Sequence, residues 1–373
     1  MKPNIKQQTA ANNYIRQLIL PSDPLSPLWN RENFIFRKQP KWNYIDCLMI
    51  GALLGLYDIT GDESLVEYSA RFMDAYVDEC GNIPTLHPED HNIDNFCGGR
   101  VLLRMNTLTS DDRYLRAAEK LFRLLVEEQP RTSSGNFWHK EIYPGQVWLD
   151  GVYMAFPFML AYARLTGNKN AEEDVYSQLE NIRIKMRDSA SGLYYHGMDE
   201  SLEAQWADKK TGLSSEFWLR SMGWLSAGLA DICGIDGSRC GEMLCGLLDS
   251  LSRCITDEGM LLQLPFREGL PGNYPETSGT LLFAYSAMKA ARLGIAGDDI
   301  KKAGIRAFEA VTGKYIDIGK DVPVLKNICL MAGLGGEPFR DGTADYYLSE
   351  QVTENDAKGI APYLMAYTEF LKA

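Results

Sequence analysis

The sequence predicts an all-α fold in which six inner helices are surrounded by six outer helices, an (α/α)6 toroid. Two kinds of helical segment alternate along the chain, one apolar on nearly every side and one amphipathic. No segment rich in Pro, Gly or Ser interrupts this alternation. We therefore expect a single domain over residues 1–373.

The inner helices are predicted by segments with almost no polar face. A helix that is apolar on every side must be covered on every side, so these segments belong inside the fold. They comprise residues 42–57, 93–105, 148–163, 217–232, 276–291 and 355–371.

The outer helices are predicted by amphipathic segments, several of which follow a helix stop of the Thr-Gly-Asp kind. They comprise residues 57–77, 106–125 and 162–182, with fainter copies at 231–251 and 291–311. In the second of these, apolar side chains recur on one helix face: Leu115, Ala118, Leu121, Phe122 and Leu125. An open solenoid of helix pairs is the alternative arrangement. The irregular repeat spacing and the apolar last helix favour a closed ring.

Composition excludes several classes of function. The net charge of −12 argues against a general nucleic-acid binder, and no apolar run is long enough to span a membrane. The N-terminus has no hydrophobic signal core, and the eight cysteines show no metal-binding spacing. We expect a cytoplasmic protein with reduced cysteines, no cofactor and no metal, either a monomer or a homodimer.

The connections that lead from an outer helix to the next inner helix resemble one another. Each begins with a turn glycine and continues into a short strand-like piece, as in residues 80–92, 133–145, 190–201 and 257–266. In a closed toroid these connections emerge at one end. They surround a single mouth, and the first residues of the inner helices line its floor.

Those first residues are unusually polar and aromatic for helices that are otherwise so apolar. They are Trp42, Tyr44, Asp46, Asp94, Trp148, Asp150, Trp218, Arg220, Trp224, Glu276, Thr277, Ser278, Asp356 and Lys358. Aromatic faces that stack on sugar rings, together with charged groups for hydroxyls and catalysis, indicate a carbohydrate site. For any one of these residues helix capping is the competing explanation. The repetition at equivalent positions favours a shared site.

Two carboxylates, Asp94 and Asp150, suggest general acid/base hydrolysis. Enclosure by Trp148, Tyr153 and Met154 would raise the pKa of Asp150, whereas a helix N-terminus would lower it. The net direction stays open at the level of sequence. His139 and His196 lie in the connections that surround the mouth.

Several stretches resemble glycoside hydrolase family 105, the unsaturated rhamnogalacturonyl hydrolases, which are relatives of the family 88 unsaturated glucuronyl hydrolases. The matching stretches lie at residues 136–154, 192–201, 214–232, 276–294 and 333–359. The motifs WLDG-x-YM and FW-x-R-x-x-GW are the most specific, whereas residues 80–92 and 296–326 match weakly.

The resemblance implies an enzyme that removes a 4,5-unsaturated uronate from the non-reducing end of oligosaccharides left by polysaccharide lyases. An Asp protonates C4 of the vinyl ether, water adds at C5, and the resulting hemiketal opens and releases the neighbouring sugar. By position, Asp150 matches the acid/base and Asp94 the second essential Asp. The resemblance also places His139, Lys140, His196, Trp218, Arg220 and Trp224 in the substrate site, with Arg220 as the partner of the uronate carboxylate. Trp42, Tyr44, Trp148, Met154 and Lys358 complete the expected substrate-binding set.

Three other functions remain open. A conventional inverting (α/α)6 glycosidase would use the same two carboxylates. A sugar 2-epimerase needs paired histidines, and only two of the four histidines lie near the mouth. A non-catalytic sugar-binding protein gives no reason for two carboxylates at equivalent positions. The most specific expectation is release of unsaturated galacturonate from rhamnose.

Overall fold

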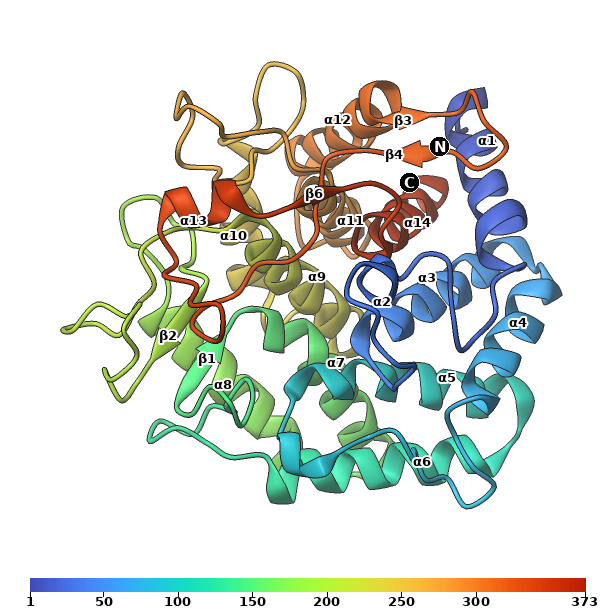
Figure 1. Cartoon of the computed structure of the whole chain (residues 1–373), viewed down its shortest axis with the longest axis horizontal. Helices are drawn as coiled ribbons and strands as arrows, with labels where there is room; N and C mark the ends of the chain where they lie inside the picture. Colours follow the sequence, from blue (N-terminus) through green and yellow to red (C-terminus); the bar gives the residue numbers. More distant parts are fainter.

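Six helices form a closed inner ring in the computed structural model, which describes residues 1–373. They are α3 (Tyr44–Thr60), α5 (Gly99–Thr109), α7 (Asp150–Thr166), α9 (Leu219–Asp236), α11 (Thr277–Arg292) and α14 (Ala357–Lys372). Each contacts the next, and α14 contacts α3, so that the ring closes (Figure 1). The predicted (α/α)6 toroid is confirmed, and the open solenoid is excluded.

Outer helices surround this ring. Five of them follow the predicted amphipathic segments: α4 (Glu63–Asp74), α6 (Asp112–Arg123), α8 (Lys169–Lys185), α10 (Gly241–Ser252) and α12 (Asp298–Tyr315). The sixth, which the sequence pattern missed, is α1 (Ile5–Asn13), continued by the π-helical turn η1 (Tyr14–Ile19). α1 packs on α12 and α14 and buries Gln7, Ala10 and Ala11, and η1 buries Tyr14, Ile15, Leu18 and Ile19. These positions recur at helical spacing, but the segment precedes the first inner helix and so stands outside the alternation that identified the other outer helices.

The predicted helix stops between the two rings are confirmed. Gly61 and Gly167 cap α3 and α7 with φ of 64° and 71°, in the left-handed region that glycine adopts without a steric penalty. The buried face of α6 contains Ala118, Leu121 and Phe122, as its periodicity predicts. One cluster of 99 buried apolar residues extends through both rings.

The second inner helix begins differently from the prediction. Residues Ile93–Gly98 form a 3₁₀ helix, η3, and the α-helix starts only at Gly99. A Cβ on Gly98 would lie 2.1 Å from Cζ2 of Trp42, and a Cβ on Gly99 would lie 2.4 Å from Phe158. The two glycines therefore allow the tight packing that brings Asp94 to the floor of the mouth.

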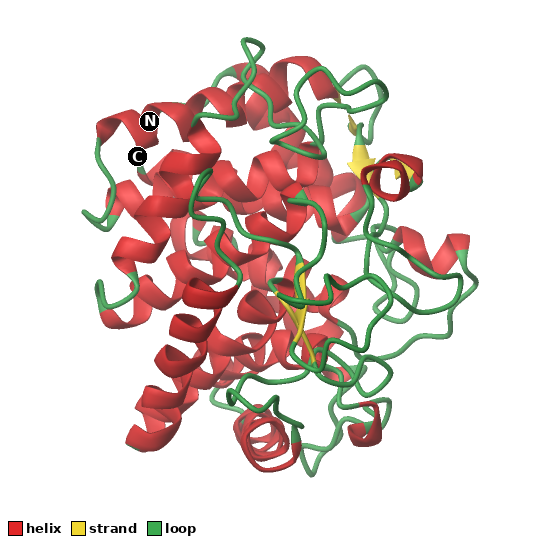
Figure 2. Cartoon of the chain, turned by 90° about the vertical axis from the view of Figure 1, so that its left-hand side faces the viewer, coloured by secondary structure: helices red, strands yellow, loops and turns green.

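Loops and short strands gather at the end of the toroid where the inner helices begin (Figure 2). The strands form three antiparallel pairs: β1 (Gln146–Trp148) with β2 (Gly197–Asp199), β3 (Ile316–Asp317) with β4 (Val324–Leu325), and β5 (Ile328–Cys329) with β6 (Val352–Thr353). The remaining elements are α2 (Arg31–Ile35), η2 (Pro88–Asp90), η4 (Leu124–Glu128) and α13 (Ala344–Ser349). No helix is both long and apolar enough to cross a membrane.

Candidate active site

A cavity of about 220 Å³ opens where the inner helices begin, as the sequence predicts. Ten of the predicted site residues line it: Tyr44, Asp94, His139, Lys140, Trp148, Asp150, Met154, Trp218, Arg220 and Trp224. They come from inner helices and from the connections between the rings. The cavity therefore assembles side chains that are far apart in the sequence.

Asp150 occupies the first turn of α7 without capping it. The cap position belongs to Leu149, which has no side chain able to accept a hydrogen bond. Oδ2 of Asp150 lies 3.4 Å from Nε2 of His196, and neither buried atom has a hydrogen-bond partner. One hydrogen placed between these two atoms would give both of them a partner.

Tyr347 lies on the other side of His196 and was not predicted. Its hydroxyl is 2.7 Å from Nδ1 of the imidazole, and both side chains are fully buried. Burial raises the pKa of Tyr347 well above its ordinary value, so the phenol keeps its proton at neutral pH. Donation of that hydrogen to Nδ1 leaves Nε2 to carry a hydrogen toward Asp150.

The structure also resolves the direction in which the pKa of Asp150 shifts. Burial is the largest single effect and raises this pKa. His196, His139 and Arg220 together lower it by more than burial raises it. The net pKa lies below the ordinary value for aspartate. The Asp150 carboxylate is therefore ionised in the resting site at neutral pH, and it must take up a proton before it can act as an acid.

Asp94 lies at the head of η3 and is paired with Lys140. Oδ2 of Asp94 is 2.8 Å from Nζ of Lys140, and Oδ1 is 3.9 Å from Nε2 of His139. Burial lowers the pKa of Lys140, but Asp94 outweighs it and the net shift is upward. Burial lowers the pKa of His139 to about 4, so this imidazole is neutral at neutral pH. Asp94 thus faces one cation and one neutral ring.

An aromatic wall holds the two histidines in place. The rings of His139 and Trp148 stack at 4.2 Å, and Tyr143 stacks on Trp148 at 4.9 Å. The β1–β2 pairing sets Trp148 opposite Gly197, directly after His196. A Cβ on Gly197 would lie 3.1 Å from the Trp148 ring, so glycine permits this close approach. The pairing therefore fixes Trp148 and His196 relative to each other.

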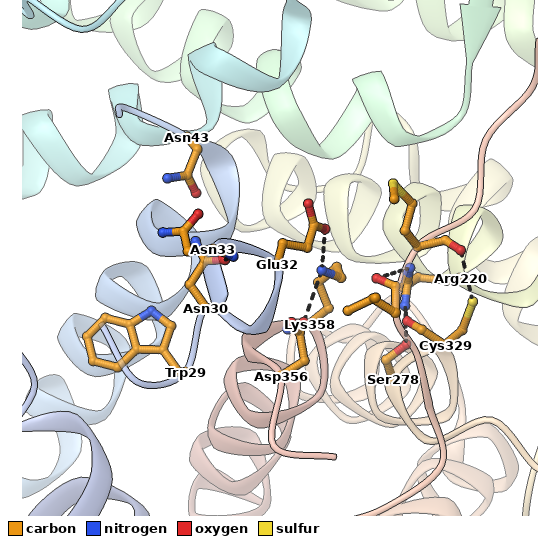
Figure 3. A network of polar contacts seen from close by, with 12 residues as sticks. Trp29, Asn30, Glu32, Asn33, Asn43, Arg220, Ser278, Cys329, Asp356 and Lys358 are labelled. Atoms are coloured by element: carbon orange, nitrogen blue, oxygen red, sulfur yellow. Dashed lines mark hydrogen bonds and ion pairs between the residues drawn. The ribbon is translucent and has the colours of Figure 1, made fainter. Parts of the chain in front are cut away.

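Three predicted substrate-binding residues lie behind the cavity wall. Trp42 donates from Nε1 to the carbonyl of Asn95 at 2.8 Å. His196 is fully buried, with Tyr347 hydrogen-bonded to its Nδ1. Lys358 is fully buried, and its Nζ lies 2.7 Å from Glu32 and 3.0 Å from Asp356 (Figure 3). Since its charge is already compensated, direct contact between Lys358 and substrate is corrected to a supporting role. Trp42 and His196 likewise act through their neighbours.

Arg220 reaches the cavity with part of its guanidinium already hydrogen-bonded. Its Nη1 donates to Ser278 at 3.3 Å and to the carbonyl of Cys329, and Nη2 donates to the carbonyl of Leu330 at 3.4 Å (Figure 3). The guanidinium also lies 4.9 Å from the Trp218 ring. Nε forms no hydrogen bond, so the edge of the guanidinium made by Nε and Nη2 is left for a carboxylate, and the expected two-pronged contact stays a prediction.

Helix capping explains other polar residues at the helix starts. Glu276 accepts from the backbone amides of Ser278 and Gly279, and Asp356 accepts from the amide of Lys358. Asp46 is buried and accepts from Trp29 at 3.0 Å; burial raises its pKa to about 6. None of these three carboxylates lines the cavity.

Two segments that the sequence analysis did not select complete the site. Residues 30–41 contribute Glu32, Lys38 and Lys41 to the cavity wall, and residues 331–340 contribute Met331 and Arg340. The second segment overlaps residues 333–359, which carry the family resemblance. The first segment carries no motif, and only its proximity to Tyr44 in the sequence could have indicated it.

Comparisons with known proteins identify the family of the chain. The family model described as Glycosyl Hydrolase Family 88 matches residues 28–373. Protein Atu3128 of Agrobacterium fabrum is 38% identical over 230 residues, covering 58% of this chain and 98% of its own. The unsaturated rhamnogalacturonyl hydrolase YesR of Bacillus subtilis is 24% identical over 200 residues, covering 52% of this chain and 54% of its own.

Among solved structures, a glycoside hydrolase from family 105 of C. acetobutylicum superposes with a TM-score of 0.89. It is 29% identical, and the superposition covers 98% of this chain and 99% of that one. The resemblance seen in the sequence is thereby confirmed, and with it an enzyme of the glycosidase class. The chain belongs to glycosyl hydrolase family 88.

Proposed function

We propose that this glycosidase removes a 4,5-unsaturated galacturonate linked to rhamnose from the non-reducing end of lyase-generated oligosaccharides. The observation that carries the proposal is the isolated pair formed by Asp150 and His196, whose facing atoms are 3.4 Å apart and otherwise unpartnered. A site that hydrates a vinyl ether needs one group able to deliver a proton to carbon and then to accept one from water.

The proposed reaction begins once Asp150 has taken up a proton from solvent water. Asp150 passes this proton to C4, which leaves positive charge at C5 and the ring oxygen. Water attacks C5 and returns a proton to Asp150, so the carboxyl group is regenerated for the next cycle. The C5 hemiketal opens to a ketone, and the hemiacetal left at C1 expels the neighbouring sugar. One water is consumed in each cycle.

Asp94 is proposed to orient the attacking water. Its Oδ2 is held by Lys140 at 2.8 Å, which leaves lone pairs on the carboxylate to accept a hydrogen from water. His139, kept neutral by burial, lies 3.9 Å from Oδ1. Holding water and C5 at a fixed distance is what this second carboxylate contributes.

Recognition of the uronate rests on cations and aromatic rings in the same cavity. Lys140, Arg220 and Arg340 line it and provide positive charge for a carboxylate. Trp148 and Trp218 line it as well and provide apolar faces for a sugar ring. The choice of rhamnose as the neighbouring sugar is supported by the similarity to a protein named as an unsaturated rhamnogalacturonyl hydrolase.

The test is a panel of unsaturated disaccharides that differ in uronate and in neighbouring sugar, followed by loss of ultraviolet absorbance. We expect the largest kcat/KM for unsaturated galacturonate linked to rhamnose. A larger value for a glucuronate substrate would correct the sugar and retain the chemistry. Turnover of saturated glycosides with no loss of absorbance from any unsaturated one would overturn the proposal and favour a conventional inverting glycosidase.

A further inference from the structure

A second and larger cavity lies at the opposite end of the toroid. Its volume is about 600 Å³, within the range of small-molecule sites, and it shares no lining residue with the mouth. On α9 the mouth is lined by Arg220 and Trp224, whereas the second cavity is lined by Asp231 and Ile235, about two turns and more further along. We call it the axial cavity.

An aromatic pair separates the two cavities. Tyr153 lines the axial cavity and Trp224 lines the mouth, and their ring centroids are 4.8 Å apart. Tyr153 is 4% exposed and Trp224 1% exposed. The axial cavity is thus a separate compartment closed at its inner end, and a ligand there would not occupy the substrate site.

Two charged triads from different inner helices line the axial cavity. In the first, Asp231 of α9 binds Arg100 of α5 and Lys289 of α11, the latter at 2.6 Å. Burial raises the pKa of Asp231, but the two cations outweigh it and keep the net pKa below its ordinary value. All three groups are therefore charged, and the triad carries one net positive charge.

The second triad has the same composition. Glu369 of α14 accepts two bonds from Arg292 of α11, at 2.7 and 3.0 Å, and lies 3.4 Å from Lys372. This triad also carries one net positive charge. It is close to the first, because Lys289 and Arg292 are three residues apart on one helix and share a face.

Both triads contain two cations for one carboxylate. Lys289, Arg292 and Lys372 lie in the last turns of α11 and α14, where the helix dipole also favours cations, and the excess positive charge faces the axial cavity. The chain as a whole carries a net charge of −12, so this local positive charge opposes the overall balance. Repulsion between two neighbouring positive centres is relieved by an anion with two charged groups.

We propose that the axial cavity binds a small dicarboxylate, with one carboxylate on each triad. The terminal nitrogens of Arg292 favour this class, since a guanidinium donates in a plane that matches a carboxylate. Only Nε and Nη2 of Arg292 are bonded to Glu369, which leaves the hydrogens of Nη1 for a ligand.

The experiment is isothermal titration calorimetry of the whole protein with succinate, and with acetate at matched ionic strength. We expect succinate to bind at least about tenfold more tightly than acetate, because it engages two positive centres. The double variant Arg292→Gln/Lys372→Gln should weaken succinate binding by about tenfold or more. If the double variant does not fold, Lys372→Gln alone should still weaken binding several-fold, since its side chain lies in the last helical turn and is 26% exposed.

Two matched variants give the experiment its specificity. Arg239→Gln removes an exposed cation paired with Glu173 and should leave succinate binding unchanged. Lys140→Gln removes a cation from the mouth and should also leave it unchanged. Equal affinities for succinate and acetate would overturn the proposal. So would binding that is lost in Lys140→Gln and kept in the double variant.

Discussion

Replacing Glu32 by Gln should destabilise the protein by an amount that depends on pH. Glu32 lies at the edge of the mouth and binds Lys358 at 2.7 Å (Figure 3). It also binds Lys38 at 2.6 Å. Burial raises the pKa of its carboxyl, but the two lysines outweigh this and lower it from 4.5 to about 2. At about 1.4 kcal/mol per pKa unit, ionised Glu32 contributes about 3 kcal/mol to the free energy of unfolding at neutral pH.

The sign of the pH dependence follows from the lowered pKa. The contribution is complete above the unfolded value of about 4.5, and it is lost as the pH falls toward 2. Urea unfolding at pH 6 should therefore show a loss of about 3 kcal/mol in Glu32→Gln, and at pH 3 about half of that. The control is Glu180→Gln, which breaks an exposed pair with Arg183 and should have no measurable effect. A loss in Glu32→Gln that is equal at both pH values, or absent, would refute the reasoning.

The remaining predictions concern catalysis and packing. Tyr347→Phe removes the hydroxyl next to His196 and should lower kcat by roughly 10- to 100-fold with KM nearly unchanged, as steady-state kinetics would measure; a change in KM alone would instead assign Tyr347 to substrate binding. Gly98→Ala should lower the free energy of unfolding by about 1–3 kcal/mol, because its Cβ would lie 2.1 Å from Trp42. Gly55→Ala, where a Cβ meets nothing within 4 Å, is the matched control and should not destabilise. Equal stability of the two glycine variants would contradict the packing argument.

The fold was predictable because its signals are local and repeated. Inner helices that are apolar all round, such as α3 and α7, alternate with amphipathic ones, such as α6, and only a double ring buries both kinds. The N-terminal helix α1 escaped prediction because it precedes the first inner helix and so stands outside the alternation that identified the other outer helices. Its place in the outer ring is set by contact with α12 and α14, at the far end of the sequence.

The site was predictable as a set of residues but not as a set of contacts. The helix starts and the connecting histidines indicated which side chains converge, and ten of them line one cavity. The hydrogen-bond partners of these side chains, however, lie in segments that show no helical or strand periodicity. Lys358 is occupied by Glu32, Arg220 by the carbonyls of Cys329 and Leu330, and His196 by Tyr347. Each of these partners comes from a distant part of the chain, so no local sequence pattern predicts the contact.

The most direct test of the proposed chemistry is a paired measurement on one unsaturated disaccharide. Loss of ultraviolet absorbance and release of the neighbouring sugar are followed in the same reaction, with the wild-type enzyme and with Asp150→Asn. We predict that the wild-type enzyme loses absorbance no later than it releases sugar, and that the folded Asp150→Asn variant does neither. Sugar release that precedes the loss of absorbance, or normal turnover by Asp150→Asn, would contradict the assignment of Asp150 as the proton donor to the double bond.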